Sequence, residues 1–128
     1  MSRFVLRQKK EFGQYFDSLP SHVKNIVNDK IVNYIQEKPL STEELSYELT
    51  GLWSYNDMKT GIRIIYAVCE DCRKKQATTI NGCGECSEVP DNTIMLWDLG
   101  NHPYDQLKMM REKAWRKFVR QRRQKRGF

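Results

Sequence analysis

Two short apolar runs, separated by a polar stretch, constrain the fold of this 128-residue chain most strongly. They are residues 62–68 and residues 94–99. Both runs are rich in aliphatic and aromatic side chains and are bounded by Gly, Asn, Asp or Pro, which is typical of strands. The second is uninterrupted from Ile94 to Trp97, so we expect a central strand covered by a helix. A small sheet is therefore the expected centre of the fold.

The spacing of apolar residues predicts two helices before this sheet. Residues 4–8 form a short first strand by composition. The face of the first helix consists of Phe12, Tyr15, Phe16 and Leu19, and Pro20 ends that helix. Ser21 is a suitable N-cap for the second helix, which ends before Pro39. Its stripe consists of Val23, Ile26, Val27, Ile31, Tyr34 and Ile35.

The segment between the helices and the sheet ends in a predicted hairpin. Residues 40–44 are a linker, and alternating apolar residues over 45–49 favour a strand or an extended edge. Residues 52–55 are a short strand, and the Asn, Asp and Gly content of residues 56–61 is typical of a turn into the next strand. The pattern predicts an α+β fold, in which two N-terminal helices pack on a mainly antiparallel four-stranded sheet.

Positive charge is concentrated at the C-terminal end. The formal net charge is +6, but residues 108–128 carry ten basic side chains against one acidic residue, Glu112. The preceding residues have a net charge of −3. An apolar stripe from Leu107 to Phe118 predicts a basic helix that docks with one face, and its charge suits a polyanion such as nucleic acid. A solvated helix end with no partner is the alternative.

Composition and length favour one soluble domain. No apolar run approaches the roughly 18 residues that a membrane span needs. The first residues, with Arg3 and Arg7 around a short apolar stretch, do not resemble a secretory signal. We therefore expect a cytoplasmic protein without a membrane partner. Residues 1–107 form the expected domain and residues 108–128 its basic helix and tail.

All four cysteines lie in a C-x2-C, ten-residue, C-x2-C array of residues 69–86. The predicted ligands of one structural Zn²⁺ are Cys69, Cys72, Cys83 and Cys86. Such a closed site would hold the two ends of the polar insert together rather than activate water. We expect Arg73, Lys74 and Lys75 of this insert to point outward. Two disulfides, or unoccupied thiols, are the alternatives. A redox C-x-x-C pair would more often occur once, at the start of a helix.

Three motifs in sequence order resemble the RelE/ParE toxin superfamily over roughly residues 3–107. They are Leu-Thr-Gly-Leu-Trp at residues 49–53, Gly-Ile-Arg-Ile-Ile-Tyr at residues 61–66, and Leu-Gly-Asn-His-Pro-Tyr at residues 99–104. The cysteine insert and the basic helix after residue 107 are absent from the minimal family pattern. The resemblance implies a RelE-like fold and the toxin of a type II toxin–antitoxin system.

The resemblance also implies an activity: ribosome-dependent cleavage of mRNA by attack of a ribose 2′-hydroxyl. His102 would be the general acid or base and Arg63 the phosphate clamp, with a second charge from Lys59 and orientation or stacking from Tyr104. A cognate antitoxin, mRNA and the ribosome are the implied partners. The residues expected to contact ribosomal RNA are Arg111, Lys113, Arg116, Lys117, Arg120, Arg122 and Arg123.

The individual residues have structural alternatives. Arg63 could point to solvent or pair with Asp98, His102 could belong to a structural turn, and Tyr104 could pack against the last helix. Two other functions compete with the nuclease: a ParE-like inhibitor of DNA gyrase, and a non-catalytic, zinc-stapled nucleic-acid-binding module.

Overall fold

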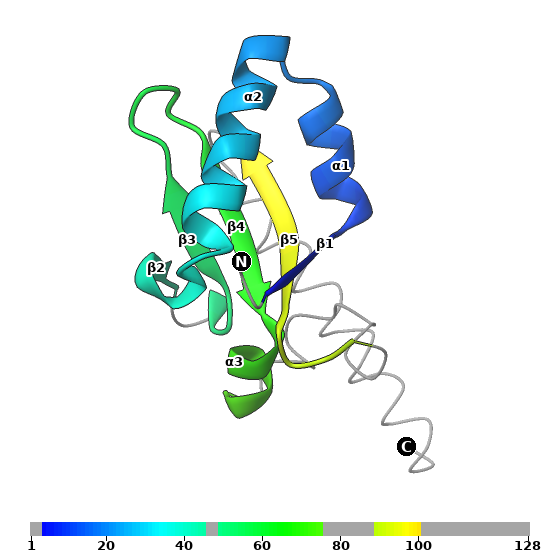
Figure 1. Cartoon of the computed structure of the whole chain (residues 1–128), viewed down its shortest axis with the longest axis vertical. Helices are drawn as coiled ribbons and strands as arrows, with labels where there is room; N and C mark the ends of the chain where they lie inside the picture. Colours follow the sequence, from blue (N-terminus) through cyan, green and yellow to red (C-terminus); the bar gives the residue numbers. More distant parts are fainter. Residues whose placement is uncertain (1–3, 46–48, 76–88, 101–128) are drawn as a thin grey trace, which may run out of the picture.

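A five-stranded sheet with two helices on one face forms the body of the molecule (Figure 1). The computed structural model describes residues 4–45, 49–75 and 89–100. The elements in chain order are β1 (Val5–Gln8), α1 (Lys10–Asp17), α2 (Ser21–Lys30), η1 (Ile31–Ile35), η2 (Pro39–Ser41), β2 (Glu43–Glu44), β3 (Trp53–Asn56), β4 (Arg63–Val68), α3 (Cys69–Lys74) and β5 (Thr93–Gly100). The predicted α+β class is confirmed.

The strands follow the order β1-β5-β4-β3-β2. β1 runs parallel to β5, and the other neighbouring pairs are antiparallel. The sheet has one strand more than expected, because the predicted linker 40–44 includes the two-residue strand β2 beside β3. The β3–β4 hairpin and the central position of β5 agree with the sequence analysis.

The helices α1 and α2 cover one face of the sheet with an apolar layer. Phe12 of α1 and Val27 of α2, together with Ile31 of η1, pack against alternating side chains of β4 and β5. Ile64 and Leu96 belong to the same cluster. Burial of aliphatic and aromatic side chains of this size contributes about 1.5–3 kcal/mol each. Burial of this apolar layer is the main interaction that holds the helices on that face of the sheet.

The second helix differs from the prediction at both ends. Ser21 is its first residue, and no side chain caps it at Pro20. Beyond Lys30 the chain forms a π-helical turn, η1, in which the amide of Gln36 donates to the carbonyl of Ile31 at 2.9 Å. The wider turn keeps Ile31 and Ile35 buried, whereas Tyr34 is 51% exposed rather than part of the stripe.

A buried hydroxyl fastens the segment after η1 to the sheet. Tyr66 of β4 donates its phenolic hydrogen bond to the carbonyl of Pro39 at 2.5 Å, and its oxygen also contacts the hydroxyl of Thr42. Burial raises the pKa of Tyr66 to about 12, so this group stays neutral at any physiological pH. The contact holds η2 beside the centre of β4 and guides the chain into β2.

A second buried apolar cluster lies on the opposite face of the sheet. It comprises Leu45, Leu49, Leu52, Ile65, Ala67, Met95 and Trp97. Side chains alternate along a strand, so Ile65 and Ala67 point away from the face that α1 and α2 cover. Arg63 precedes Ile65 by two residues and shares this second face.

Candidate functional site

Arg63 stands at the start of β4, where three strands meet. It pairs with Asn56 of β3 on one side and with Gly100 of β5 on the other. The side chain is partly exposed, at the end of an otherwise buried strand. A guanidinium in this position offers a fixed fork of donors that suits a phosphate group. The predicted phosphate clamp therefore lies at the end of the central ladder.

The side chain of Asp57 braces the turn before Arg63. The carboxylate of Asp57 accepts hydrogen bonds from the amide of Thr60 at 3.0 Å and from its hydroxyl. These bonds to Thr60 lower the pKa of Asp57 in spite of its burial. Gly61 closes the turn with a φ of 73°, a conformation that favours glycine. Lys59 is exposed at the tip of this braced turn, as predicted.

The last described residue, Gly100, ends β5 directly opposite Arg63. Its φ of 148° is rare for residues with a side chain, although a Cβ there would meet no other atom. The backbone conformation, rather than the space, therefore favours glycine. His102 and Tyr104 lie outside the described residues, as do the seven basic residues predicted to contact RNA.

A β-bulge in β5 places a carboxyl on the same face as Arg63. Ile65 pairs with Asp98 and Tyr66 with Leu96, so Trp97 is the extra residue of β5. The bulge turns Asp98 toward the face of Ile65 and returns Leu99 to the helix-covered core. Regular alternation would have pointed Asp98 at the helices instead.

Asp98 is almost completely buried, at 1% exposure. Its Oδ1 accepts the amide hydrogen bond of Leu99 at 2.8 Å, while its Oδ2 has no partner. Burial raises the pKa of Asp98 to about 6, and the negative charge of Glu11 adds to that increase. The alternative that Arg63 pairs with Asp98 is therefore not what the structure shows. The sequence analysis considers Asp98 only as a possible partner of Arg63, although a lone acid after four apolar residues is a signal of a buried acid.

Cys69 and Cys72 lie in the first turn of α3 and are both buried. They are not joined by a disulfide. Residues three apart on a helix share a face, so one ion can reach both sulfur atoms. Cys83 and Cys86 lie outside the described residues, and within the described part no group of three or more possible metal ligands occurs. The predicted zinc site is thus described for one half only.

Polar contacts hold α3 against the sheet on two sides. The indole of Trp53 donates to Asp71 at 2.9 Å, and Lys75 bonds both Asp71 at 2.9 Å and Glu44. Burial lowers the pKa of Lys75, but the hydrogen bonds with Glu44 and Asp71 outweigh it and raise the pKa overall. The ammonium also lies 4.9 Å from the centroid of the Trp53 ring.

On its other side α3 is tied to the segment that precedes β5. Arg73 pairs with Asp91 and donates to the carbonyl of Val89 at 2.6 Å. The expectation that Arg73 to Lys75 point outward is therefore wrong for Arg73 and Lys75, which bind the fold itself. Lys74 alone of the three is mainly exposed, with its side chain 73% accessible beside Glu70.

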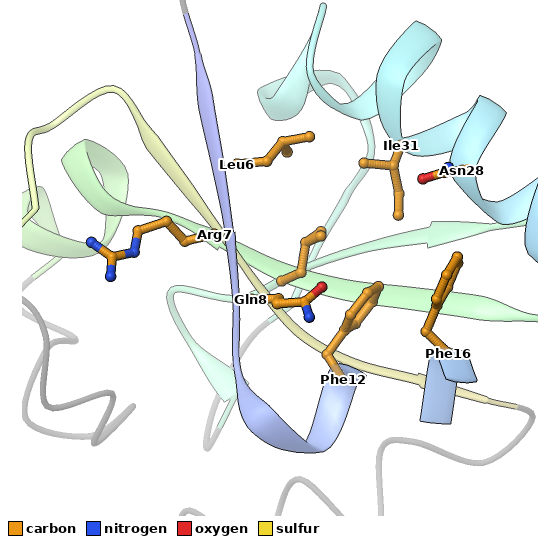
Figure 2. A pocket seen from close by; sticks show the side chains of 8 residues that line it. Leu6, Arg7, Gln8, Phe12, Phe16, Asn28 and Ile31 are labelled. Carbon is orange, nitrogen blue, oxygen red and sulfur yellow. The ribbon is translucent and has the colours of Figure 1, made fainter. Parts of the chain in front are cut away.

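A cavity of about 280 Å³ lies away from this site, between β1, α1 and α2. It is lined by Leu6, Arg7, Gln8, Phe12, Phe16, Asn28, Ile31 and Leu96. In Figure 2 the Arg7 side chain points away from the other labelled residues, and Gln8 and Asn28 are further polar residues of the lining. The lining shares no residue with the Arg63 region.

No protein-family model and no curated protein sequence matches this chain. Solved structures do. The RelBE2 toxin–antitoxin complex of Mycobacterium tuberculosis matches with a TM-score of 0.55 and 14% identity, over 77% of this chain and 98% of the matched chain. The fold is that of the RelE toxins. The intact Escherichia coli RelBE complex matches with a TM-score of 0.54 and 13% identity, over 77% and 96% of the two chains.

The isolated E. coli RelE toxin matches with a TM-score of 0.52 and 13% identity, over 76% of this chain and 82% of that chain. The RelE-like fold expected from the three motifs is thereby confirmed. Among the described residues, no helix is long and apolar enough to cross a membrane.

Proposed function

We propose that this chain is the toxin of a type II toxin–antitoxin system and acts as a ribosome-dependent endoribonuclease on mRNA. The observation that carries the proposal is a RelE-like fold with a cationic side chain, Arg63, at the end of the central β4–β5 ladder. Lys59 on the braced turn before β4 adds a second positive charge at the same end of the hairpin.

The proposed reaction needs charge and proton transfer at a single phosphodiester. The ribose 2′-oxygen attacks the adjacent phosphorus, loses its proton to a base, and forms a 2′,3′-cyclic phosphate. The bond from phosphorus to the 5′-oxygen breaks, and an acid gives that oxygen a proton. Positive groups stabilise the crowded anionic phosphorane between these steps.

The chain's own residues can fill these roles. Arg63 clamps the phosphate with its fork of donors, supported by Lys59. His102, whose ordinary pKa is about 6.5, serves as general acid or base, and Tyr104 orients the substrate or stacks on a base. In the sequence His102 follows Gly100 by two residues, and Gly100 pairs with Arg63. This short separation in sequence supports a joint role of His102 and Arg63 at one phosphate.

A cognate antitoxin is the proposed protein partner. Two of the matched solved structures are toxin–antitoxin complexes, which supports such a partner for this chain. The basic helix and tail, residues 108–128, would bind ribosomal RNA, since ten cationic side chains in this short segment suit a phosphate backbone.

We further propose that Cys69, Cys72, Cys83 and Cys86 hold one structural Zn²⁺. Two buried cysteines on one face of α3 support this half of the site. The contacts of Asp71 and Arg73 with the sheet fix the direction of α3, which prepares these thiols for an ion. Four thiolates close the coordination shell, so this zinc is structural.

Metal analysis tests the zinc proposal. We expect about one zinc per chain in the purified protein and loss of the metal in Cys83→Ser, while the neighbouring Ser87→Ala keeps it. Two intact disulfides, seen as the absence of free thiols in the unfolded protein, would contradict the proposal.

Cleavage in a purified translating extract tests the proposed function. We expect the wild-type chain to cut mRNA on the ribosome, and Arg63→Gln and His102→Ala to lose at least 100-fold in rate. Lys24→Gln, a charge loss beside Phe16 on the helical face, should cut normally. Intact mRNA together with inhibited gyrase would favour the ParE-like alternative. Intact mRNA with gyrase unaffected would favour the non-catalytic module.

A further inference from the structure

The π-helical turn η1 brings to the surface an aromatic side chain that a regular helix would place in the buried stripe. Ile31 and Ile35 of this turn remain buried, whereas Tyr34 is 51% exposed. Such turns within helices are rare and occur frequently at functional sites. An exposed aromatic ring in this turn therefore calls for an explanation beyond packing.

A second tyrosine lies beside the first. The ring centroids of Tyr34 and Tyr55 are 5.8 Å apart, and the two rings are tilted by 37°. Tyr55 of β3 is partly buried and packs against the helix-covered core. This contact holds the Tyr34 ring beside the sheet, so a ligand that binds the exposed part of the ring meets a surface with little conformational entropy to lose.

Two lysines supply positive charge around this aromatic pair. The ammonium of Lys30 lies 4.7 Å from the centroid of the Tyr34 ring. The hydrogen bonds of Thr60 lower the pKa of Asp57 most, and the positive charge of Lys30 lowers that pKa further, so Lys30 lies near the turn before β4. Lys59 is exposed on the same turn. Because a lysine stem is flexible, its ammonium can move from an aromatic ring to a phosphate.

The aromatic pair and the candidate phosphate clamp lie on either side of one edge of the sheet. Tyr55 pairs with Ile64, the residue after Arg63. β2 pairs with only the first two residues of β3, so within the described part of the chain β3 is the edge strand at Tyr55. Successive residues of a strand point to opposite faces, and an RNA strand that passes this edge can contact both places. An acid also lies at the edge, since Glu43 accepts a hydrogen bond from Asn56 at 3.3 Å.

We propose that the aromatic pair and the two lysines form one binding surface for single-stranded RNA. One nucleobase stacks on the ring of Tyr34, and Lys30 and Lys59 contact the phosphates beside it. Unpaired bases stack on aromatic side chains, and such stacking accepts any base because every base has a π-face. The surface would hold a nucleotide next to the cleaved phosphodiester, and on that point the inference rests on the proposed function.

Binding of a short oligonucleotide tests the surface without the ribosome. The probe is a single-stranded 2′-O-methyl RNA with one 2-aminopurine: it offers no 2′-hydroxyl for attack, and its fluorescence falls when the modified base stacks. Tyr34→Ala should bind it about 5- to 150-fold more weakly, because the stacking of one base contributes this much. Tyr34→Phe keeps the ring and should bind and quench the probe like wild type.

The control for this experiment lies on the same turn. Val32→Ala removes another exposed apolar side chain of η1 and should bind like wild type. A thermal unfolding transition like that of wild type shows that Tyr34→Ala is folded. Equal affinity of Tyr34→Ala and wild type overturns the proposal and favours a protein partner as the occupant of this surface.

The charges of the surface give a second readout that does not depend on the Tyr34 variant. Lys30→Gln should weaken binding several-fold at low salt and make the dependence on salt concentration shallower, by up to about 0.7 for one lost phosphate contact. Glu43→Gln removes the acid at the edge and should strengthen binding. Unchanged affinity together with unchanged salt dependence in Lys30→Gln overturns the proposal.

Cleavage in a translating extract separates this inference from the proposed function. We expect Tyr34→Ala to cut mRNA but to need a higher concentration than wild type for the same extent of cleavage. If wild type cuts mRNA and Tyr34→Ala cuts and binds equally well, the proposed function stands and the RNA surface falls. If wild type leaves mRNA intact but binds the oligonucleotide through Tyr34, the proposed function falls and the RNA surface stands.

Discussion

At the scale of single residues, the buried carboxyl of Asp98 makes the stability of the fold depend on pH. Its pKa in the folded chain is raised from 3.8 to about 6. A raised pKa means that folding favours the protonated acid. The corresponding stability is fully present below the unfolded pKa of 3.8 and is lost as the pH rises through about 6.

Asp98→Asn should therefore stabilise the chain at pH 7.5. The amide keeps the shape and the Leu99 hydrogen bond but carries no charge, so the free energy of unfolding should increase by about 1–3 kcal/mol. Denaturant unfolding at pH 7.5 and at pH 4 measures the difference, which should nearly vanish at the lower pH. The exposed substitution Asp29→Asn should change stability by less than about 0.5 kcal/mol at either pH. A variant less stable than wild type at pH 7.5 would contradict this explanation.

At the scale of secondary-structure elements, α3 depends on its contacts with the sheet rather than on its own length. It spans six residues, and isolated helices this short are not stable in water. The hydrogen bond from Trp53 to Asp71 and the ion pair of Arg73 with Asp91 join it to β3 and to the start of β5. These contacts should persist whether or not zinc is bound.

A double-mutant cycle measures the β3–α3 contact. Trp53→Phe and Asp71→Ala should each destabilise the fold by about 1–3 kcal/mol, because the first removes the donor and the second the acceptor of a partly buried hydrogen bond. The double variant should cost less than the sum, with a coupling energy of about 0.5–1.5 kcal/mol. The pair Ser18→Ala and Asp71→Ala, which share no contact, should be additive. Additivity in the first cycle would show that the bond contributes nothing.

Elements with a strong apolar period were predictable from the sequence, and those defined by a tertiary partner were not. The stripes of α1 and α2 and the runs of β4 and β5 gave the right elements in the right order. β2 is two residues long and exists only because β3 lies beside it. The bulge at Trp97 likewise depends on the ladder with β4. Because of this bulge, regular alternation of side chains along β5 predicts the wrong face of the sheet for Asp98.

The candidate site was predictable to the same degree. Arg63 and Lys59 lie on the strand and in the turn that the sequence predicts for them, because Asn, Asp and Gly followed by an apolar run locate both elements. The start of α3 at Cys69 was not foreseen, since a C-x2-C pair has no helical period of its own. Tyr34 was assigned to the buried stripe because a regular α-helix was assumed where the chain forms a π-helical turn.

At the scale of the whole molecule, the uneven distribution of charge along the sequence predicts that the affinity for RNA falls as the salt concentration rises. Replacing Arg120, Arg122 and Arg123 by Gln removes three of the ten basic side chains in residues 108–128. Affinity for ribosomal RNA should fall several-fold at low salt, and its dependence on salt concentration should become shallower, by up to about 0.7–0.9 per lost phosphate contact. Filter binding over a range of salt concentrations measures both, with Lys10→Gln on α1 as control. An unchanged slope would remove these residues from the interface.

The chemistry of the product ends tests the account most directly. Messenger RNA recovered from a translating extract with the wild-type chain should carry a 2′,3′-cyclic phosphate or its 3′-phosphate hydrolysis product on one fragment and a 5′-hydroxyl on the other. Arg63→Gln should yield neither end above background. Fragments with a 3′-hydroxyl and a 5′-phosphate, or intact messenger RNA with the wild-type chain, would contradict attack by the 2′-hydroxyl at this site.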